Sequence, residues 1–488
     1  MTSPLFRVDP RDDVAVALRD LEAGEDAEVR LLEPVARGHK VALRPIAAGE
    51  IVRKFGFPIG RALREIQAGT HVHSHNLGTA LRERGDYQYR PAPTPASGER
   101  AAPPGFLGYR RADGRVGTRN EIWIIPTVGC VGRTAEKIAA RAAVKHAGRV
   151  DGVHGFAHPF GCSQLGDDLD GTRALLAALA SHPNAGGVLI LGLGCESNQL
   201  SQLLPGIAAG ANVLALGAQA AGDEIEEGLA LVDALVEVAA QVKRAPVSLS
   251  DLVLGVKCGG SDGFSGLTAN PLVGRMSDAV TEAGGTAILT EIPEIFGAEH
   301  LLMDRAADAA VFREIGGLVN GFKRYFTDHG EGLSDNPSPG NIAGGITTLE
   351  EKSLGAVQKG GHAVVTDVLP YGGRVRRPGL TLLEAPGNDA VSATALAAAG
   401  ATAILFTTGR GTPLGFPVPT IKIASNSELA RRKPGWIDFD AGRVLEEGFA
   451  PAAEALLDTI RAVASGEETA AERNDEREIA IWKRGVTL

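Results

Sequence analysis

Residues 257–271, KCGGSDGFSGLTANP, form the stretch around which the rest of the chain is organised. An apolar run at 252–256 leads to Cys258, glycines then interrupt regular structure, and Asn270 with Pro271 opens a helix. Glycines let a backbone approach a ligand closely, and free N–H groups at a helix start favour anions. The stretch therefore predicts a strand that ends in a thiol and a polar turn with the ligand-binding candidates Ser261, Asp262, Ser265 and Asn270. The alternative is a tight turn that carries a buried structural cysteine.

On both sides of this stretch the sequence has the pattern of an α/β protein. Short apolar runs alternate with helical segments, which predicts parallel sheets covered by helices on both faces. We expect one α/β domain at 107–248 and a second at 249–488 that ends in a helix, with no chemistry in residues 445–488. The strand-like runs are 121–128, 152–157, 187–193, 212–216, 252–256, 362–368, 381–384, 401–406 and 420–423.

The first 90 residues show a different pattern. Short β-like runs between turn residues predict a small β-rich domain at 1–90. It closes with GTHVHSHNL, in which His71, His73 and His75 alternate, so that on a strand all three imidazoles would lie on one face and could bind a metal or move protons. The alternative is an exposed polar strand face. Residues 91–106, rich in Pro and Ala, are predicted to be a linker.

The composition excludes several classes of partner. With 488 residues and a net charge of −10, the chain is a poor match for nucleic acid or anionic membrane. No apolar run is long enough to span a bilayer, the N-terminus lacks a signal-peptide pattern, and four cysteines suit a reducing cytoplasm better than a disulfide scaffold. The 63 glycines indicate many ligand-facing turns. We therefore expect a cytoplasmic protein that acts on a small molecule, with a homodimer as the default assembly.

All four cysteines follow predicted strands. In an open parallel sheet the carboxyl ends of the strands share one rim, where ligands bind. The separations of 32, 33 and 63 residues match no zinc-finger or zinc-ribbon spacing. We predict that at least three of the four share a site suited to iron or an iron–sulfur cluster; the candidates are Cys130, Cys162, Cys195 and Cys258.

Two further segments carry candidate polar groups. Thr347 and Glu350 fit a capping box and predict a helix at 349–359, so Glu351 and Lys352 lie near its start as candidates for substrate binding and proton transfer. The alternative is a solvated helix start with dipole-favoured carboxylates. Arg410, between two glycines after a strand, is placed to bind a carboxylate, unless it is an ordinary loop arginine.

Taken in order, the motifs resemble the altronate/galactarate dehydratase family over nearly the whole chain. The N-terminal region is similar to that family's SAF (β-clip) domain. The motifs that carry the resemblance are HVHSHNL (71–77), GYRRADGRVGTRN (108–120), PTVGC (126–130), LGCE (193–196), CGGSDGFSGLTANP (258–271), IFGAEHLL (295–302), NPSPGNIAGGITTLEEKSLGAVQKGG (336–361) and FTTGRGTPLGFPVPTIK (406–422).

The resemblance implies a hydro-lyase of hexuronate catabolism that removes water from a sugar acid to give a 2-keto-3-deoxy product. The preferred substrate is altronate, which would give 2-keto-3-deoxygluconate; galactarate and related hydroxy acids are the alternatives. The family is described as iron-dependent and helped by reducing agents, with Mn(II) as a substitute. Such a reaction needs a base for the α-proton, an acid for the leaving hydroxyl and stabilisation of an enediolate-like intermediate. Our acid–base candidates are His73, His75 and Lys352.

The metal centre has two interpretations at this stage. One is a single Fe(II) bound by histidines and carboxylates, with His71, His73 and His75 as the histidine set. The other, which we prefer, is a labile cluster on three of the four cysteines, with one iron open to substrate.

Two other functional classes compete with the dehydratase. A nucleotide-cofactor oxidoreductase would fit parallel sheets and Gly-rich turns, but the sequence lacks a dinucleotide-binding fingerprint. A non-catalytic module that binds a sugar acid or a metal is the second.

Overall fold

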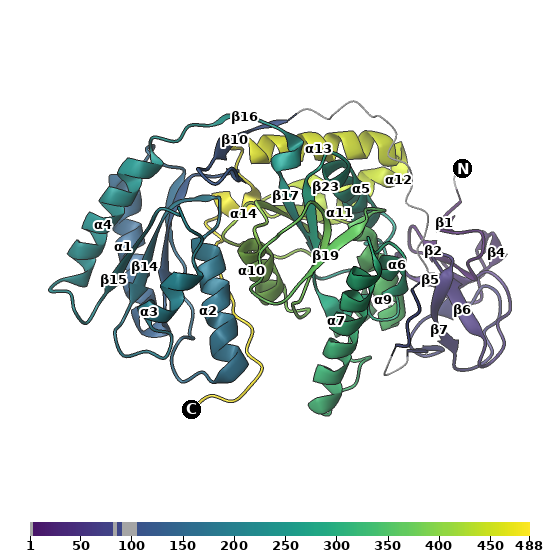
Figure 1. Cartoon of the computed structure of the whole chain (residues 1–488). Helices are drawn as coiled ribbons and strands as arrows, with labels where there is room; N and C mark the ends of the chain where they lie inside the picture. The colour runs from purple at the N-terminus through teal and green to yellow at the C-terminus, as the bar shows by residue number, and fades with distance from the viewer. Residues whose placement is uncertain (1–2, 82–84, 90–104) are drawn as a thin grey trace.

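The computed structural model describes residues 3–81, 85–89 and 105–488, and its strands form a β-rich N-terminal part followed by two parallel sheets (Figure 1). The predicted linker at 91–106 lies outside the described residues except for its last two positions. None of the helices in the described ranges has the length and apolar character needed to cross a membrane.

The N-terminal part consists of short antiparallel strands, drawn in purple in Figure 1. Its sheets have the orders β1-β2-β5-β8 and β6-β7-β9, with a separate β3-β4 pair. Buried apolar side chains such as Val41, Val52 and Val72 fill its interior. The strands are β1 (Leu5–Phe6), β2 (Val14–Ala17), β3 (Asp26–Ala27), β4 (Val29–Arg30), β5 (Lys40–Ala42), β6 (Ile51–Lys54), β7 (Phe57–Ala62), β8 (His71–Val72) and β9 (Leu77–Gly78).

The middle part contains a four-stranded parallel sheet of order β13-β12-β14-β15. Helices α1 and α4 cover one face and α2 the other, so β12 and most of β14 are buried on both faces, as near-continuous apolar strands require. A small sheet, β11-β10-β16, adjoins it. The elements are β10 (Phe106–Arg110), β11 (Val116–Gly117), β12 (Glu121–Pro126), α1 (Gly132–Lys145), β13 (Gly152–Gly155), α2 (Gly166–Ala180), β14 (Ala185–Gly192), α3 (Leu200–Leu203), β15 (Val213–Gly217), α4 (Glu224–Ala239) and β16 (Ala245–Val247).

The C-terminal part is built on a seven-stranded parallel sheet of order β19-β20-β18-β17-β21-β22-β23. Helices α5 and α10 both pack on its central strands. The elements are β17 (Val253–Cys258), α5 (Ala269–Glu282), β18 (Thr286–Leu289), α6 (His300–Met303), α7 (Ala309–Asp328), α8 (Pro339–Ala343), α9 (Leu349–Ala356), β19 (Val365–Leu369), β20 (Gly379–Leu383), α10 (Asp389–Ala399), β21 (Ala403–Thr408), β22 (Thr420–Ala424), α11 (Ser427–Arg432), β23 (Phe439–Asp440), α12 (Val444–Glu447), α13 (Phe449–Ala464) and α14 (Ala470–Arg473).

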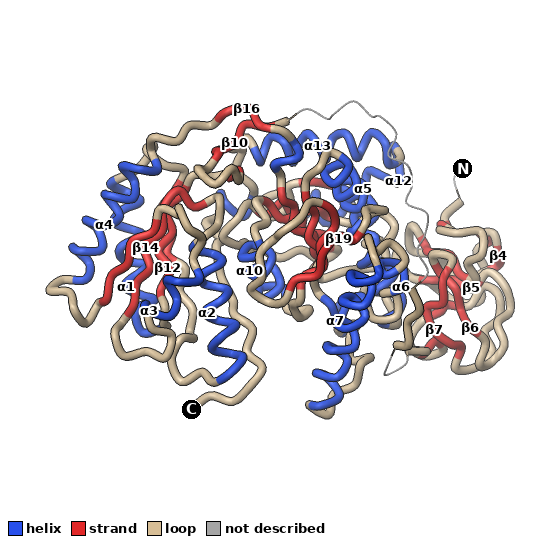
Figure 2. Tube along the Cα trace, in the orientation of Figure 1, coloured by secondary structure: helices blue, strands red, loops and turns tan. Residues whose placement is uncertain are grey.

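Short 3₁₀ turns complete the list, and one hydrophobic core joins the three parts. The turns are η1 (Gly129–Val131), η2 (Leu204–Gly206), η3 (Leu249–Asp251), η4 (Ile292–Ile295), η5 (Val357–Gly360) and η6 (Ala441–Arg443). The core runs from the β-rich part through the seven-stranded sheet to the face of the four-stranded sheet that carries α2, and Figure 2 shows the strands of each part as separate red groups. The rigidity of each site therefore depends on packing between the parts as well as within them.

The predicted fold class is confirmed, because a β-rich N-terminal part precedes parallel α/β sheets. The predicted domain limits stay predictions. Two local predictions are wrong. The histidine strand β8 ends at Val72, because the following residues turn so that Asn76 Oδ1 accepts the His73 N–H. The cap of α9 is Thr348 rather than Thr347, with its side chain accepting the Glu351 N–H.

A buried carboxylate attaches the N-terminal part to α9. Glu351 Oε2 lies 2.9 Å from Lys40 Nζ on β5, and Oε1 lies 2.8 Å from Lys54 Nζ on β6. All three side chains are at most 2% exposed. Although burial opposes ionisation, the two ammonium groups hold the pKa of Glu351 far below its usual value, while burial lowers the pKa of Lys40 to about 8. We call these three residues the interdomain triad.

We predict that Glu351→Gln destabilises the protein by about 3–5 kcal/mol, because it leaves two buried ammonium groups without their counter-charge. Urea unfolding followed by circular dichroism measures the change. The matched control is Glu428→Gln, which removes an exposed pair with Arg37 across the same two parts and should cost less than about 1 kcal/mol.

The same triad predicts a pH dependence. Because the folded pKa of Glu351 is depressed, its stabilising contribution is complete above the unfolded pKa, about 4.3, and is lost as the pH falls toward the folded value. A triple variant, Lys40→Met with Lys54→Met and Glu351→Leu, should recover most of the stability lost in Glu351→Gln and lack this acid-dependent component. Equal acid sensitivity in the triple variant and the wild type would contradict this prediction.

Candidate active site

Strand β17 ends at Cys258, which lines a cavity of about 390 Å³ at the carboxyl edge of the seven-stranded sheet. This position is where open parallel sheets bind ligands. One wall is polar, formed by Ser261, Asn336, Ser338 and Asn341, and another is aromatic, formed by Tyr325, Phe326 and Trp482. A small molecule with several hydroxyl groups and an apolar edge matches this lining.

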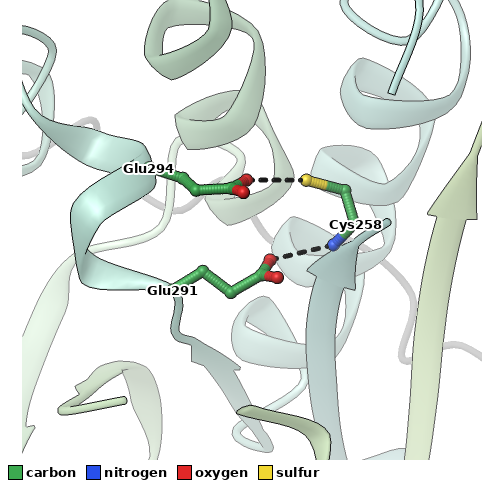
Figure 3. A group of neighbouring side chains, drawn as sticks. All are labelled: Cys258, Glu291 and Glu294. Atoms are coloured by element: carbon green, nitrogen blue, oxygen red, sulfur yellow. Dashed lines mark hydrogen bonds between the residues drawn. The ribbon is translucent and has the colours of Figure 1, made fainter. Parts of the chain in front are cut away.

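Two carboxylates from the loop after β18 face Cys258 (Figure 3). Glu291 Oε2 accepts the Cys258 backbone N–H at 3.0 Å, and Glu294 Oε2 accepts the thiol at 3.2 Å. Glu291 has a left-handed backbone, with φ of 64°, which a glutamate rarely adopts. Backbone strain of this kind is concentrated at functional sites, where the surrounding structure maintains it.

Three lysine ammonium groups balance the carboxylates. Lys257 Nζ lies 3.0 Å from Glu291 and 2.8 Å from Asp389, and Lys359 Nζ lies 3.5 Å from Glu291. Lys352 Nζ lies 2.8 Å from Glu294 Oε1. All these lysines are buried or nearly so, which makes the cluster a network of charges with little water to screen it.

The Lys352 ammonium group is held in a defined direction. Besides its ion pair with Glu294, its ammonium group donates to Asn336 Oδ1 at 2.9 Å and to Asn341 Oδ1 at 3.1 Å. Three acceptors therefore match its three N–H donors. A substrate hydroxyl that replaces one amide would meet an oriented proton donor.

The network separates the pKa values of its members. Burial raises the pKa of Glu291, whereas for Glu294 the nearby Lys352 and Lys359 outweigh burial and lower it. For Lys352 the carboxylate of Glu294 outweighs burial and raises the pKa. Burial raises the pKa of Cys258 to about 12, with Glu294 adding to the effect. At neutral pH, Glu294 is therefore a carboxylate, Lys352 an ammonium ion and Cys258 a thiol.

Cys258, Glu291 and Glu294 are also a candidate metal site, since one ligand atom from each lies within 4.8 Å of the others, and no other such group occurs in residues 3–81, 85–89 and 105–488. One sulfur and two carboxylates fit a divalent cation such as Fe(II) or Mn(II) in type and spacing. Binding one would release the thiol proton and use Glu294 Oε2, which now accepts the thiol, while the other oxygen, Oε1, is the one paired with Lys352.

The structure brings only part of the predicted site together. Cys258, Ser261 and Lys352 line the large cavity. Asp262 accepts hydrogen bonds from Ser265 and from the side chains of Ser425 and Asn426, and Asn270 bonds to Thr407 and to the Gly355 carbonyl. These contacts hold the loop 257–271 in place, and Asp262, Ser265, Asn270 and Glu351 also line a smaller cavity of about 20 Å³ together with Cys258, Ser261 and Lys352.

Two more predicted ligands also bind protein groups. Glu351 belongs to the interdomain triad. Arg410 donates to the Gly340 carbonyl at 3.2 Å and lies beside the cavity without lining it. The glycine-rich turn itself is held by a close approach, since a Cβ on Gly263 would lie 2.0 Å from the Gly38 carbonyl oxygen of the β-rich part.

The three predicted histidines lie together with a fourth, His39, which the sequence did not single out. Ring centroids of His71 lie 5.1, 5.2 and 5.6 Å from those of His39, His73 and His75. His73 Nε2 lies 3.0 Å from the Ile342 carbonyl oxygen on α8, so the cluster rests on a helix that lines the cavity, but neither His73 nor His75 lines it. Burial lowers the pKa of His39 and His73, and burial with neighbouring histidines lowers that of His71 to about 3.

The four cysteines do not lie on one sheet, so the prediction of a single rim is wrong for Cys258. Cys130, Cys162 and Cys195 follow β12, β13 and β14 of the four-stranded sheet and are exposed, whereas buried Cys258 ends β17 of the other sheet. The strand pattern predicts where each strand ends but contains no information on which strands share a sheet.

Several members of the site were missed by the sequence interpretation. Glu291, Glu294 and Lys359 look like ordinary charged residues in the sequence. Two quoted motifs mark their neighbourhood: IFGAEHLL begins one residue after Glu294, and the motif at 336–361 contains Lys359. Trp482 lines the cavity, although no residue of 445–488 was expected to take part in the site.

Comparison with known proteins covers all three parts. The family model "Altronate/galactarate dehydratase SAF domain" matches residues 3–80, "D-galactarate dehydratase/Altronate hydrolase, second domain" matches 108–240, and "D-galactarate/Altronate dehydratase, C-terminal" matches 249–487. The chain is 51% identical over 495 residues to an altronate dehydratase of Escherichia coli (strain K12) and 47% identical over 497 residues to one of Bacillus subtilis (strain 168), with 99% of each chain covered. It is 36% identical to a galactarate dehydratase (L-threo-forming) of Escherichia coli (strain K12), over 96% of this chain and 94% of the relative.

We predict that Cys258 is alkylated about 10³-fold more slowly than an ordinary thiol at pH 8, because a pKa of about 12 leaves only about one part in 10⁴ as thiolate. Mass spectrometry of metal-free protein treated with iodoacetamide gives the rate for each cysteine. The exposed Cys130, Cys162 and Cys195 are the internal controls and should react first. Reaction of Cys258 in the folded protein at the same rate as these three would contradict the prediction.

Proposed function

The chain belongs to the altronate/galactarate dehydratase family, and from this membership we propose that it removes water from altronate to give 2-keto-3-deoxygluconate. The observation that carries the proposal within the structure is the pair formed by Lys352 and Glu294 on the wall of the large cavity, 2.8 Å apart. Lys352 is an ammonium ion and can donate a proton, and Glu294 is a carboxylate and can accept one. A β-elimination of water needs both groups beside the same two carbon atoms.

We assign the base to Glu294 and the acid to Lys352. The carboxylate takes the proton from C2 of the sugar acid, the C3–O bond breaks, and the ammonium group protonates the departing hydroxyl to form water. The enol that results tautomerises to the 2-keto-3-deoxy acid. These roles replace the acid–base candidates His73 and His75, because neither histidine lines the cavity and His73 bonds to a backbone carbonyl of α8 instead.

The intermediate needs stabilisation while negative charge grows on the substrate carboxylate. Lys257 and Lys359 supply positive charge behind the two glutamates, and the low exposure of the cluster strengthens their effect. A divalent cation on Cys258, Glu291 and Glu294, with iron as the proposed metal, would add Lewis acidity at the carboxylate. Ser261, Ser338 and Asn341 are the proposed contacts for the substrate hydroxyls.

The direct test is product formation by the purified protein. We expect altronate, supplied anaerobically with Fe(II) and a thiol reductant, to give one equivalent of 2-keto-3-deoxygluconate, detected by chromatography and mass spectrometry. Galactarate, as a parallel substrate, distinguishes the two activities named for the relatives. Turnover of neither acid by metal-loaded, folded protein would overturn the proposal.

We predict that Lys352→Met and Glu294→Gln each lower kcat/KM by about 10²–10⁴-fold, the usual contribution of a positioned acid or base. Two exposed residues provide matched controls with the same chemical changes, Lys243→Met and Glu454→Gln, and should keep full activity. Circular dichroism on all four variants separates loss of chemistry from loss of fold.

The pKa directions also predict the pH profile of kcat/KM. Glu294 has a lowered pKa and is ionised above about pH 4.5, while Lys352 has a raised pKa and is protonated below about pH 10.5. Since both groups keep their active forms between these limits, we expect no ionisation from this pair near neutrality. A bell-shaped profile centred near pH 7 would contradict the assignment.

A further inference from the structure

Three exposed cysteines lie at the carboxyl edge of the four-stranded sheet, outside the proposed active site. Cys130, Cys162 and Cys195 follow β12, β13 and β14, which are consecutive neighbours in the order β13-β12-β14-β15. None of the three lines the large cavity. The carboxyl ends of parallel strands form the ligand-binding edge of such sheets, so three thiols gather where this second sheet would bind a ligand.

The three cysteine-bearing loops are hydrogen-bonded directly to one another. The Gly129 N–H donates to the Phe160 carbonyl at 2.9 Å, which joins the first loop to the second. The Asn198 N–H donates to the Gly161 carbonyl at 2.9 Å, which joins the second to the third. The Thr127 hydroxyl donates to Glu196 at 2.6 Å, which joins the first to the third. Residues within one to three positions of each cysteine are therefore fixed relative to the others.

Buried polar groups hold this arrangement. Glu196 is 3% exposed and, besides Thr127, accepts the N–H groups of Leu193 and Gly194. Asn198 is fully buried and donates to the Thr127 carbonyl, while its Oδ1 has no hydrogen-bond partner in the described structure. A buried amide oxygen without a partner costs stability. The three loops therefore contain buried polar side chains, Glu196 and Asn198, where apolar residues would be enough for packing.

The backbone at Cys162 is unusual on both sides. Gly161 has φ of 101° and Ser163 has φ of 57°, both in the left-handed region. A Cβ at position 161 would lie 2.0 Å from the Thr127 carbonyl oxygen, so the loops approach as closely as a glycine permits. Left-handed non-glycine residues persist only where the surrounding structure enforces them, and ligand clamps are a common place for them.

From these contacts we propose that Cys130, Cys162 and Cys195 ligate an iron–sulfur cluster through three thiolates, at a site separate from the dehydratase pocket. The sulfurs are not all within 4.8 Å of one another, since the described residues contain no such group besides that of Cys258. Three thiolates on one tetrahedral ion, at about 2.3 Å each, lie about 3.8 Å apart. A cluster has its irons at separate corners and accepts thiolates that are spread more widely.

One helix favours the negative charge of such a cluster. Helix α1 begins at Gly132, two residues after Cys130, and has no acidic side chain in its first turn. With 14 residues it directs a partial positive charge at that turn, which stabilises a nearby thiolate, whereas the first turn of α2, four residues after Cys162, carries Asp167 and Asp168.

The end of the chain connects this site to the active site. The Leu488 N–H donates to the Ser163 carbonyl, next to Cys162, while Trp482 lines the large cavity. Six residues of extended chain span at most about 20 Å, so the cluster site lies near the dehydratase pocket without joining it. Loss of the cluster should therefore loosen the tail before it affects acid–base chemistry.

The test measures iron, acid-labile sulfide and the visible spectrum of protein reconstituted anaerobically with Fe(II), sulfide and thiol. We expect roughly equal iron and sulfide in the wild type, and loss of at least nine-tenths of the sulfide in Cys130→Ser, Cys162→Ser and Cys195→Ser. The matched control Cys258→Ser should retain the cluster. Circular dichroism verifies that each serine variant is folded.

Each other outcome overturns the proposal. Wild-type protein without sulfide after reconstitution excludes a cluster, and iron or zinc bound without sulfide points to a single ion instead. Loss of sulfide in Cys258→Ser would assign the cluster to the other sheet. The readout is independent of the proposed function, because Lys352→Met should lose turnover and keep its sulfide, whereas the three serine variants should lose sulfide whatever their turnover.

Discussion

The burial of Glu351 between Lys40 and Lys54 is the interaction on which the active site depends. Removing three charged groups from water is costly, and only the complete set, with both carboxylate oxygens paired, offsets that cost. The β-rich part can therefore dock on α9 only in the register that forms both ion pairs. The next residue along the helix, Lys352, extends into the cavity toward Glu294. Docking of the N-terminal part thus fixes the position of the proposed acid.

The sequence predicted the sheets well because the apolar pattern of a buried strand can be read from the residues of that strand alone. A strand buried on both faces must be apolar along its length, and such runs at β12, β14 and β17 can be recognised without any tertiary information. The proposed base could not be found in this way. Glu291 and Glu294 are buried only because Lys257, Lys352 and Lys359 neutralise them, and these partners lie 34 to 68 residues away in the chain. No pattern of neighbouring residues records such a pairing.

The roles of polar residues in the predicted site are ambiguous for the same reason. Polar residues in a glycine-rich turn can face a ligand or hold the turn itself, and the sequence is identical in the two cases. Asp262 holds the turn, because Ser265, Ser425 and Asn426 use its oxygens, whereas Ser261, one position earlier, lines the cavity. The histidines show a related ambiguity. Their alternation suggested a strand, yet a turn at Asn76 brings them together instead.

The cysteines illustrate how one residue type at one topological position can serve different chemistry. Cys258 ends strand β17 and Cys195 follows strand β14 by three residues, and each lies beside a glutamate, Glu294 in space and Glu196 in sequence. Around Cys258, burial and the charge of Glu294 favour the protonated thiol, which limits it to donating a hydrogen bond unless a cation replaces the proton. Around Cys195, the Glu196 side chain accepts backbone N–H groups, and the exposed sulfur has the Gln219 amide as a hydrogen-bond donor at 3.4 Å. The orientation of one carboxylate therefore decides whether a strand-end thiol becomes part of an acid–base network or remains available as a ligand.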